Sequence, residues 1–162
     1  MEILDVCCGS RMMWFDKQNP NVIFGDIRKE TITVKDRSNG KEDGTRSIII
    51  NPDIEMDFRN IPFEQNTFNL VVFDPPHLVR VGEKSWLASK YGSLSNDWKD
   101  DIEKGFSECF RVLRNGGTLI FKWNETQIKT KEVLSLTNHK PLFGHTSGHK
   151  GFTHWYVFMK DV

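Results

Sequence analysis

Residues 69–77 read NLVVFDPPH, and this stretch decides how the chain is organised. The apolar run at 70–73 has the composition of a buried strand, and it ends abruptly in Asp74-Pro75-Pro76-His77. In open sheets of parallel strands, ligands bind outside the carboxyl ends of the strands. We therefore expect this acid, the two prolines and the histidine to stand at a binding edge. The alternative is that Asp-Pro-Pro forms a strand-ending turn and nothing more.

Apolar runs on both sides predict an α/β protein. Further strand-like segments lie at 2–8, 21–28, 54–58, 117–123, 140–146 and 153–160. A helical pattern covers about 96–113 and is stopped by Asn115-Gly116-Gly117. About a dozen residues between the first two strands leave room for one short helix. Strands alternating with helices predict a mostly parallel sheet with an antiparallel C-terminal pair. No linker or repeat divides residues 1–162, so we expect one domain.

Residues 30–51 interrupt this alternation. The segments TITVKD and RSIIIN flank RSNGKEDG, which contains the hairpin signals Asn39-Gly40 and Asp43-Gly44. The sequence predicts a β-ribbon inserted after the second strand. An isolated ribbon is only marginally stable in water, so we expect it to project and to contact a substrate, a partner or a second copy of the chain in a homodimer.

Composition limits the classes of function. The chain has 22 basic and 22 acidic residues, so a nucleic-acid partner needs a local basic patch. Candidates are Arg28, Lys29, Lys35 and Arg37 together with 84–90, although these could equally be solvated faces. No apolar run approaches the length of a membrane span, and three cysteines form neither a disulfide framework nor a metal pair. A soluble, cytoplasmic protein without membrane contact is expected.

Acidic residues recur at the ends of the expected strands. Asp5, Asp26 and Asp74 each lie at or near the carboxyl end of one strand-like run. Gly9 follows the first run, where a turn and a helix N-terminus would offer free N–H groups. Asp26 could accept hydrogen bonds from the two hydroxyls of a ribose. Asp57 and Phe58 place an acceptor beside an aromatic ring, which suits the amino group and the face of adenine.

In these motifs the sequence resembles the class I S-adenosylmethionine-dependent methyltransferases, and more narrowly those that methylate amino groups of nucleic-acid bases. The resemblance rests on LDVCCGS, GDIR, DFRNIPFEQNTFNLVVFDPPH and ECFRVLRNGGTLIFK, which cover roughly Ile3 to Trp123 in order. It implies a Rossmann-like seven-stranded sheet. Two positions depart from the family pattern: Arg11 stands where a glycine is usual, and His77 stands where an aromatic residue is usual.

The resemblance also implies roles for individual residues. S-adenosylmethionine would be held by Asp5, Cys7, Cys8, Gly9, Asp26, Ile27, Asp57 and Phe58, the two cysteines through their backbone. The catalytic group would be Asp74, Pro75, Pro76 and His77. The Asp74 carboxylate and the Pro75 carbonyl could accept the two hydrogens of an exocyclic amine and so localise its lone pair for attack on the methyl group. His77 would stack on an extruded base or carry a proton away.

Several alternatives stay open. The acceptor could be adenine N6, our first choice, or another base amine in DNA or RNA, a small molecule or a protein amide. The chain could also be a non-catalytic partner subunit that binds the cofactor. Trp86 and Trp98 follow the catalytic motif, where a substrate lid would lie. A metal site is conceivable among His139, His145, His149 and His154, but a solvated loop explains them better, so no metal is expected.

Overall fold

The computed structural model describes residues 2–36, 38, 40–82 and 85–161. Arg37, Asn39 and Lys84, which entered the expectations for basic patches and for the hairpin, lie outside the described residues.

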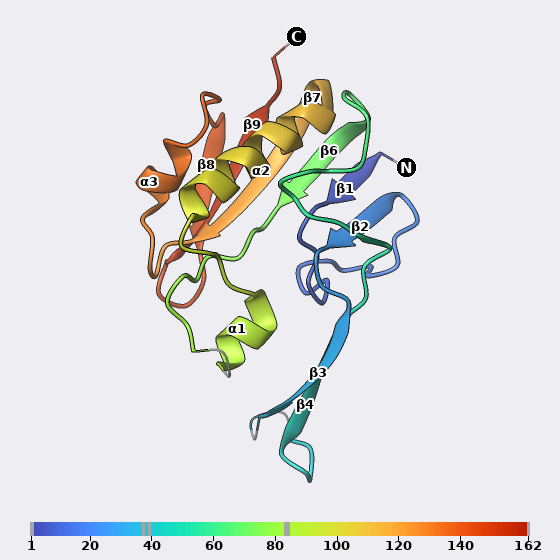
Figure 1. Cartoon of the computed structure of the whole chain (residues 1–162), viewed down its shortest axis with the longest axis vertical. Coiled ribbons are helices and arrows are strands. Elements are labelled where there is room, and N and C mark those ends of the chain that lie inside the picture. Colours follow the sequence, from blue (N-terminus) through green and yellow to red (C-terminus); the bar gives the residue numbers. More distant parts are fainter. Residues whose placement is uncertain (1, 37, 39, 83–84, 162) are drawn as a thin grey trace.

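A seven-stranded sheet in the order β5-β2-β1-β6-β7-β9-β8 forms the centre of the molecule (Figure 1). The first five strands in this order run parallel to their neighbours, and β9 runs antiparallel to both β7 and β8, which confirms the expected sheet. Their bounds are β1 (Ile3–Asp5), β2 (Val22–Asp26), β5 (Ile54–Glu55), β6 (Phe68–Phe73), β7 (Leu113–Asn124), β8 (Phe143–Ser147) and β9 (Thr153–Met159).

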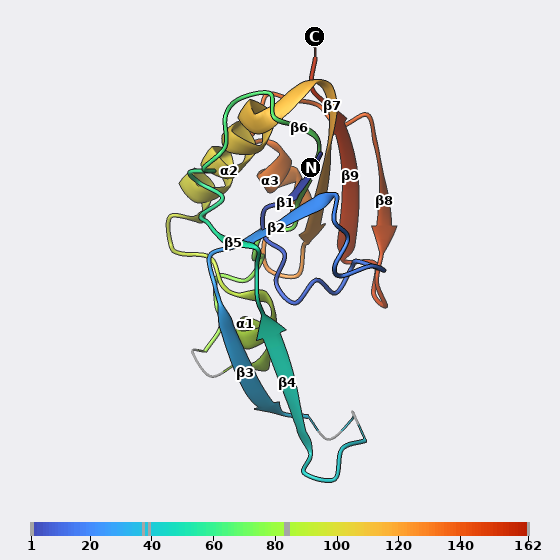
Figure 2. The ribbon, with the colours of Figure 1, turned by 90° about the vertical axis from the view of Figure 1, so that its right-hand side faces the viewer.

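Helix α2 (Trp98–Val112) connects β6 to β7 and packs on both strands, with α3 (Thr130–Leu134) on the same face of the sheet (Figure 2). The apolar stripe of α2 includes Ile102 and Phe106, both fully buried. The helix ends at Val112, within one residue of the expected end, because Leu113 pairs with Phe68 in the sheet. Asn115, Gly116 and Gly117, which were expected to stop the helix, lie instead in a bulge, across which the pairing shifts to Leu70 with Thr118.

The segment between β1 and β2 contains turns, so the short helix expected there was wrong. Gly9 and Arg11 both have left-handed backbone conformations, with φ of 50° and 55°, and a right-handed helix cannot begin through them. Side chains hold the segment instead. The indole Nε1 of Trp14 donates to Asp5 at 2.7 Å, and its ring meets Phe24 edge-on at 5.2 Å.

The ribbon consists of β3 (Glu30–Lys35) and β4 (Thr45–Ile50), paired antiparallel over their full length, as expected. Figures 1 and 2 show that it extends away from the sheet, next to the short helix α1 (Trp86–Tyr91). Among the described residues, no helix is long and apolar enough to span a bilayer.

Candidate active site

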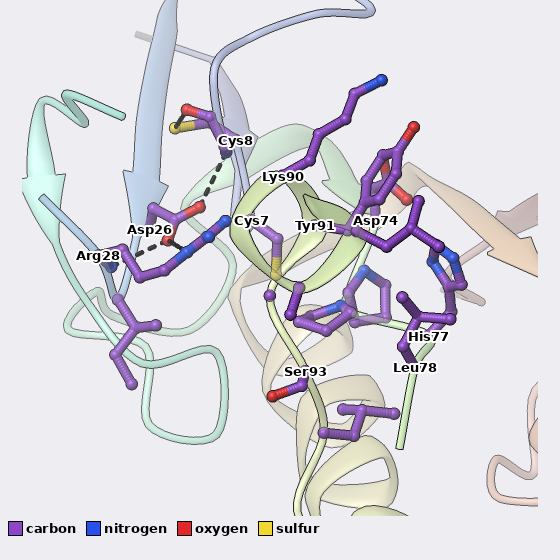
Figure 3. A pocket seen from close by; sticks show the side chains of 18 of the residues that line it. Cys7, Cys8, Asp26, Arg28, Asp74, His77, Leu78, Lys90, Tyr91 and Ser93 are labelled. Carbon is purple, nitrogen blue, oxygen red and sulfur yellow. Dashed lines mark hydrogen bonds and ion pairs between the residues drawn. The ribbon is translucent and has the colours of Figure 1, made fainter. Parts of the chain in front are cut away.

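A cavity of about 1020 Å³ lies at the carboxyl ends of the parallel strands. Its walls come from the segments that follow β1, β2, β5 and β6, from α1 and from the end of β7. Of the residues expected to form the site, those lining it are Cys7, Cys8, Gly9, Asp26, Ile27, Asp57, Phe58, Asp74, Pro75, Pro76 and His77. Figure 3 shows Asp26 with Arg28 on one side of this space and Asp74 with His77 on the other.

Asp26 organises the side formed by β1 and β2. Its side chain is almost fully buried, Oδ2 accepts the Gly9 N–H at 2.8 Å, and Oδ1 accepts the Arg28 N–H at 2.9 Å. A carboxylate has about four acceptor positions, so capacity remains for further donors. A methyl group placed on Gly9 would meet no atom within 4 Å, which means that this backbone faces open space.

Arg11 takes the left-handed conformation that a glycine would adopt without strain, and its side chain is occupied elsewhere. The guanidinium donates to the carbonyls of Lys17 and Asn51 at 2.6 and 2.8 Å and to Asp53 at 3.0 Å. It also lies 3.9 Å from the centre of the Phe24 ring. The left-handed turn at this position is therefore built with arginine and held by its side chain.

Asp57 lines the cavity, and its carboxylate already forms an ion pair with Arg59. The Arg59 guanidinium contacts both of its oxygens, at 2.6 Å for Nη2 to Oδ2, and also reaches Asp101 at 3.0 Å. These bonds hold the pKa of Asp57 below its ordinary value. A new donor at Asp57 would share its oxygens with Arg59.

Asp5 does not line the cavity, unlike the other acids at the strand ends. It is fully buried, accepts from the Cys7 N–H at 3.2 Å and from Trp14, and burial raises its pKa to about 7. Its contacts anchor the turns between β1 and β2, so its geometry offers structural support for the site and no direct ligand contact.

Asp74 forms an ion pair that the sequence did not suggest. Lys122 Nζ lies 2.7 Å from Asp74 Oδ2, and the ammonium also stands 5.4 Å from the centre of the Trp155 ring. Burial raises the pKa of Asp74, and the charge of Lys122 acts against that rise. No described residue donates a hydrogen bond to Oδ1 of Asp74 or to the Pro75 carbonyl.

His77 is enclosed by aromatic rings. Its ring centre lies 5.4 Å from that of Tyr91 and 6.4 Å from that of Trp123. Burial, with a smaller contribution from Lys122, lowers the pKa of His77 to about 4. The imidazole is therefore neutral near pH 7 and presents a flat uncharged ring to the cavity.

Known proteins resemble the chain in structure. No protein-family model and no curated sequence matches it. The PH0226 protein of Pyrococcus horikoshii superposes with a TM-score of 0.59 at 15% identity, over 99% of this chain and 82% of that one. An S-adenosylmethionine-dependent methyltransferase of Methanosarcina mazei gives a TM-score of 0.59 at 14% identity, over 99% and 92%. TrmN of Thermus thermophilus superposes with a TM-score of 0.59 at 13% identity, over 99% of this chain and 44% of that one.

The chain has the S-adenosylmethionine-dependent methyltransferase fold. In this methyltransferase fold the expected seven-stranded sheet is complete, and the ribbon of β3 and β4 occupies the connection between β2 and β5. At these identities the likeness concerns the fold alone.

The two tryptophans and the C-terminal histidines considered in the sequence have the following places in the structure. Neither Trp86 nor Trp98 lines the main cavity: Trp98 packs against the core, and Trp86 lines a smaller neighbouring cavity. Within the part of the chain that the structure describes, no three histidine, cysteine or acidic side chains are placed to hold a metal ion. His139 stacks on Phe110 at 3.6 Å between ring centres.

Lys122 was the functional candidate missed by reasoning from the sequence. It follows the apolar run of β7 in the same way that Asp74 follows β6, and the register pairs Phe73 with Phe121. A lysine at the carboxyl end of a buried strand was the available signal. Its significance depends on which strand lies beside β6, and that is a property of the assembled sheet.

Proposed function

We propose that this chain transfers a methyl group from S-adenosylmethionine to the exocyclic amine of a nucleic-acid base, with adenine N6 as the first acceptor to test. One observation carries the proposal: Asp74 and Pro75 at the end of β6 line the same cavity as Gly9 and Asp26 at the ends of β1 and β2. The methyltransferase fold supports the enzyme class and the cofactor.

The residues on the β1–β2 side fit the cofactor. Asp26 keeps acceptor capacity for the ribose hydroxyls, and Gly9 allows close approach to the backbone. Ile27 is largely exposed and lines the cavity, where it can cover one face of the adenine. S-adenosylmethionine would supply the electrophilic methyl group: its S–CH3 bond breaks as the N–CH3 bond forms, S-adenosylhomocysteine leaves, and the methylated amine releases one proton to solvent.

Asp74 and Pro75 act on the acceptor. An exocyclic amine is a weak nucleophile because its lone pair is conjugated with the ring. Oδ1 of Asp74 and the Pro75 carbonyl can each accept one amine hydrogen, which favours a tetrahedral nitrogen and stabilises the transition state more than the ground state. The two prolines fix φ at consecutive positions and so hold the Pro75 carbonyl in place. Lys122 occupies only the other oxygen of Asp74.

His77 provides a surface for the base. A neutral ring beside Tyr91 can stack on an extruded base, as aromatic and apolar side chains do in enzymes that flip their target nucleotide. Its depressed pKa disfavours a role as proton carrier at neutral pH.

The test is transfer of label from tritiated S-adenosylmethionine to DNA, RNA and protein, followed by nucleoside analysis. Asp74→Ala should lower kcat by about 30- to 1000-fold, equivalent to ~2–4 kcal/mol, and leave cofactor affinity nearly unchanged. Asp26→Ala should show the opposite pattern, with weakened cofactor binding in calorimetry. Full activity of the Asp74→Ala protein, or label found only in protein, would overturn the proposal.

A further inference from the structure

A second cavity of about 500 Å³ adjoins the main one. It lies between the turns after β1, strand β4 of the ribbon and helix α1, the elements that meet beside the ribbon in Figure 2. Gly9, Ser10, Met12 and Lys90 line both cavities. The two cavities are therefore neighbours, and a chain-like ligand with one unit in the main cavity can place an adjacent unit in the second.

The second cavity concentrates positive charge in a chain whose net charge is zero. Arg11, Lys17, Arg46 and Lys90 line it, and no described acidic residue does. Arg11 and Arg46 pair with carboxylates outside the lining, at 3.0 and 3.6 Å. Within the described ranges, neither Lys17 nor Lys90 forms an ion pair, so both remain available to an anion.

An aromatic ring stands among these charges. The guanidinium of Arg46 lies 5.9 Å from the centre of the Trp86 ring, and the ammonium of Lys90 lies 5.7 Å from it. Trp86 is half-buried, so part of the ring remains accessible. Grooves that bind single-stranded nucleic acid combine these two elements, cations for the phosphates and aromatic faces for the bases.

We propose that this second cavity binds a nucleotide that flanks the target base in a single-stranded or locally opened nucleic acid. Lys17, Arg46 and Lys90 contact its phosphates, and Trp86 stacks on its base. An acidic protein segment would use the cations but has no use for the ring or for continuity with the main cavity. The inference rests on the proposed function, since it assumes that the acceptor is part of a polynucleotide.

Binding of a fluorescent single-stranded oligonucleotide of about twelve nucleotides, measured by anisotropy over a range of salt, tests the cations. Lys17→Gln and Lys90→Gln should each weaken binding at low salt and reduce the slope of log K against log salt by ~0.7, the value for one phosphate contact in a single strand. The matched control is Lys131→Gln, an exposed lysine on α3, far from the ribbon in Figure 1; its slope should equal that of the wild type.

Trp86 needs a separate readout. Trp86→Ala should weaken binding by about 5- to 100-fold with an unchanged salt slope, because stacking releases no counterions. Trp86→Phe should restore most of the loss. Equal competition by poly-glutamate at the same charge concentration, together with no effect of Trp86→Ala, would identify an acidic protein as the occupant and overturn the inference.

Methylation assays separate this inference from the proposed function. If the wild type methylates nucleic acid and the Lys17, Lys90 and Trp86 variants match it in KM and in salt slope, the inference is wrong and the proposed function stands. If the wild type neither binds nor methylates nucleic acid but still binds S-adenosylmethionine, both the proposed function and this inference are wrong. A raised KM in these variants alone, with the Lys131→Gln protein unchanged, supports both.

Discussion

Lys122 Nζ lies 2.7 Å from Oδ2 of Asp74, across the adjacent parallel strands β6 and β7. Under the proposed function Asp74 accepts one hydrogen bond from Lys122 at Oδ2 and one from the acceptor amine at Oδ1, and an ionised carboxylate accepts both best. Burial works against this ionisation. The ammonium of Lys122 counters this effect at Oδ2, and no described residue donates to Oδ1. If Asp74 binds the acceptor as proposed, Lys122 acts through Asp74 as a positioning residue.

Replacing Lys122 by methionine should therefore change the pH dependence of methyl transfer. Removing the positive charge raises the pKa of Asp74 further, so the acid limb of the kcat/KM profile should move to higher pH. The loss of one charge-assisted hydrogen bond predicts a decrease in kcat of about tenfold or more at pH 7. Lys122→Arg should restore much of the activity and move the limb back. An acid limb at the wild-type pH in Lys122→Met would rule out this role.

His77→Phe distinguishes a stacking ring from a proton carrier. Since the pKa of His77 is lowered to about 4, its protonation contributes no limb to the activity profile near pH 6.5. The phenylalanine variant should keep activity within about tenfold and show the wild-type profile between pH 5 and 8, whereas His77→Ala should raise KM through loss of the stacking surface. An inactive phenylalanine variant that binds cofactor and substrate normally would favour proton transfer instead.

Asp5→Asn should change how stability depends on pH. The folded pKa of Asp5 is about 7, raised from 3.8, so the folded state holds more protons between these values and this group's contribution to stability is lost as pH rises from about 4 to 7. The full effect across this range is on the order of 4 kcal/mol. Asparagine keeps an acceptor for Trp14 and cannot ionise.

The measurement for Asp5 is urea unfolding at pH 5 and pH 8. The decrease in stability from pH 5 to pH 8 seen in the wild type should be smaller in Asp5→Asn. Asp16→Asn, at an exposed position of the same segment, serves as the control and should behave as the wild type. Identical pH dependence in all three proteins would mean that Asp5 ionises freely in the folded chain.

Arg11→Gly tests whether the side chain or the backbone governs the turn after β1. Glycine removes the cost of the left-handed conformation, about 1 kcal/mol, but also removes three hydrogen bonds and the contact with Phe24. We expect a net decrease in the free energy of unfolding of about 1–3 kcal/mol. Arg11→Ala should lower the free energy of unfolding by about 1 kcal/mol more than Arg11→Gly, because alanine keeps the cost of the left-handed backbone conformation. A more stable glycine variant would show that the guanidinium contacts contribute little.

The buried strands, and the acidic residues at their carboxyl ends, were predictable from the sequence. Parallel strands covered on both faces appear as continuous apolar runs, so β2, β6 and β7 could be recognised, and Asp26 and Asp74 followed from where those runs end. The ribbon was equally visible because its turn residues are local signals. In each case the information lies within a few consecutive residues.

Features that depend on distant contacts were not predictable. The segment after Gly9 looked compatible with a helix, and two left-handed residues together with the hydrogen bond from Trp14 to Asp5 decided otherwise. Asp5 and Asp74 both end strands, yet one faces the interior and the other the cavity. Only the register between β6 and β7 places Lys122 next to Asp74.

The same register has a consequence for the chain during its synthesis. Asp74 and Lys122 are 48 residues apart, and the whole of α2 separates them, so Asp74 leaves the ribosome long before its counter-charge does. A nascent chain that ends within α2 carries Asp74-Pro75-Pro76-His77 on a strand without its β7 neighbour. Parallel pairing across such a crossover forms late in folding, so the chemical competence of this site should arise only after residue 124 has been added and β7 has docked.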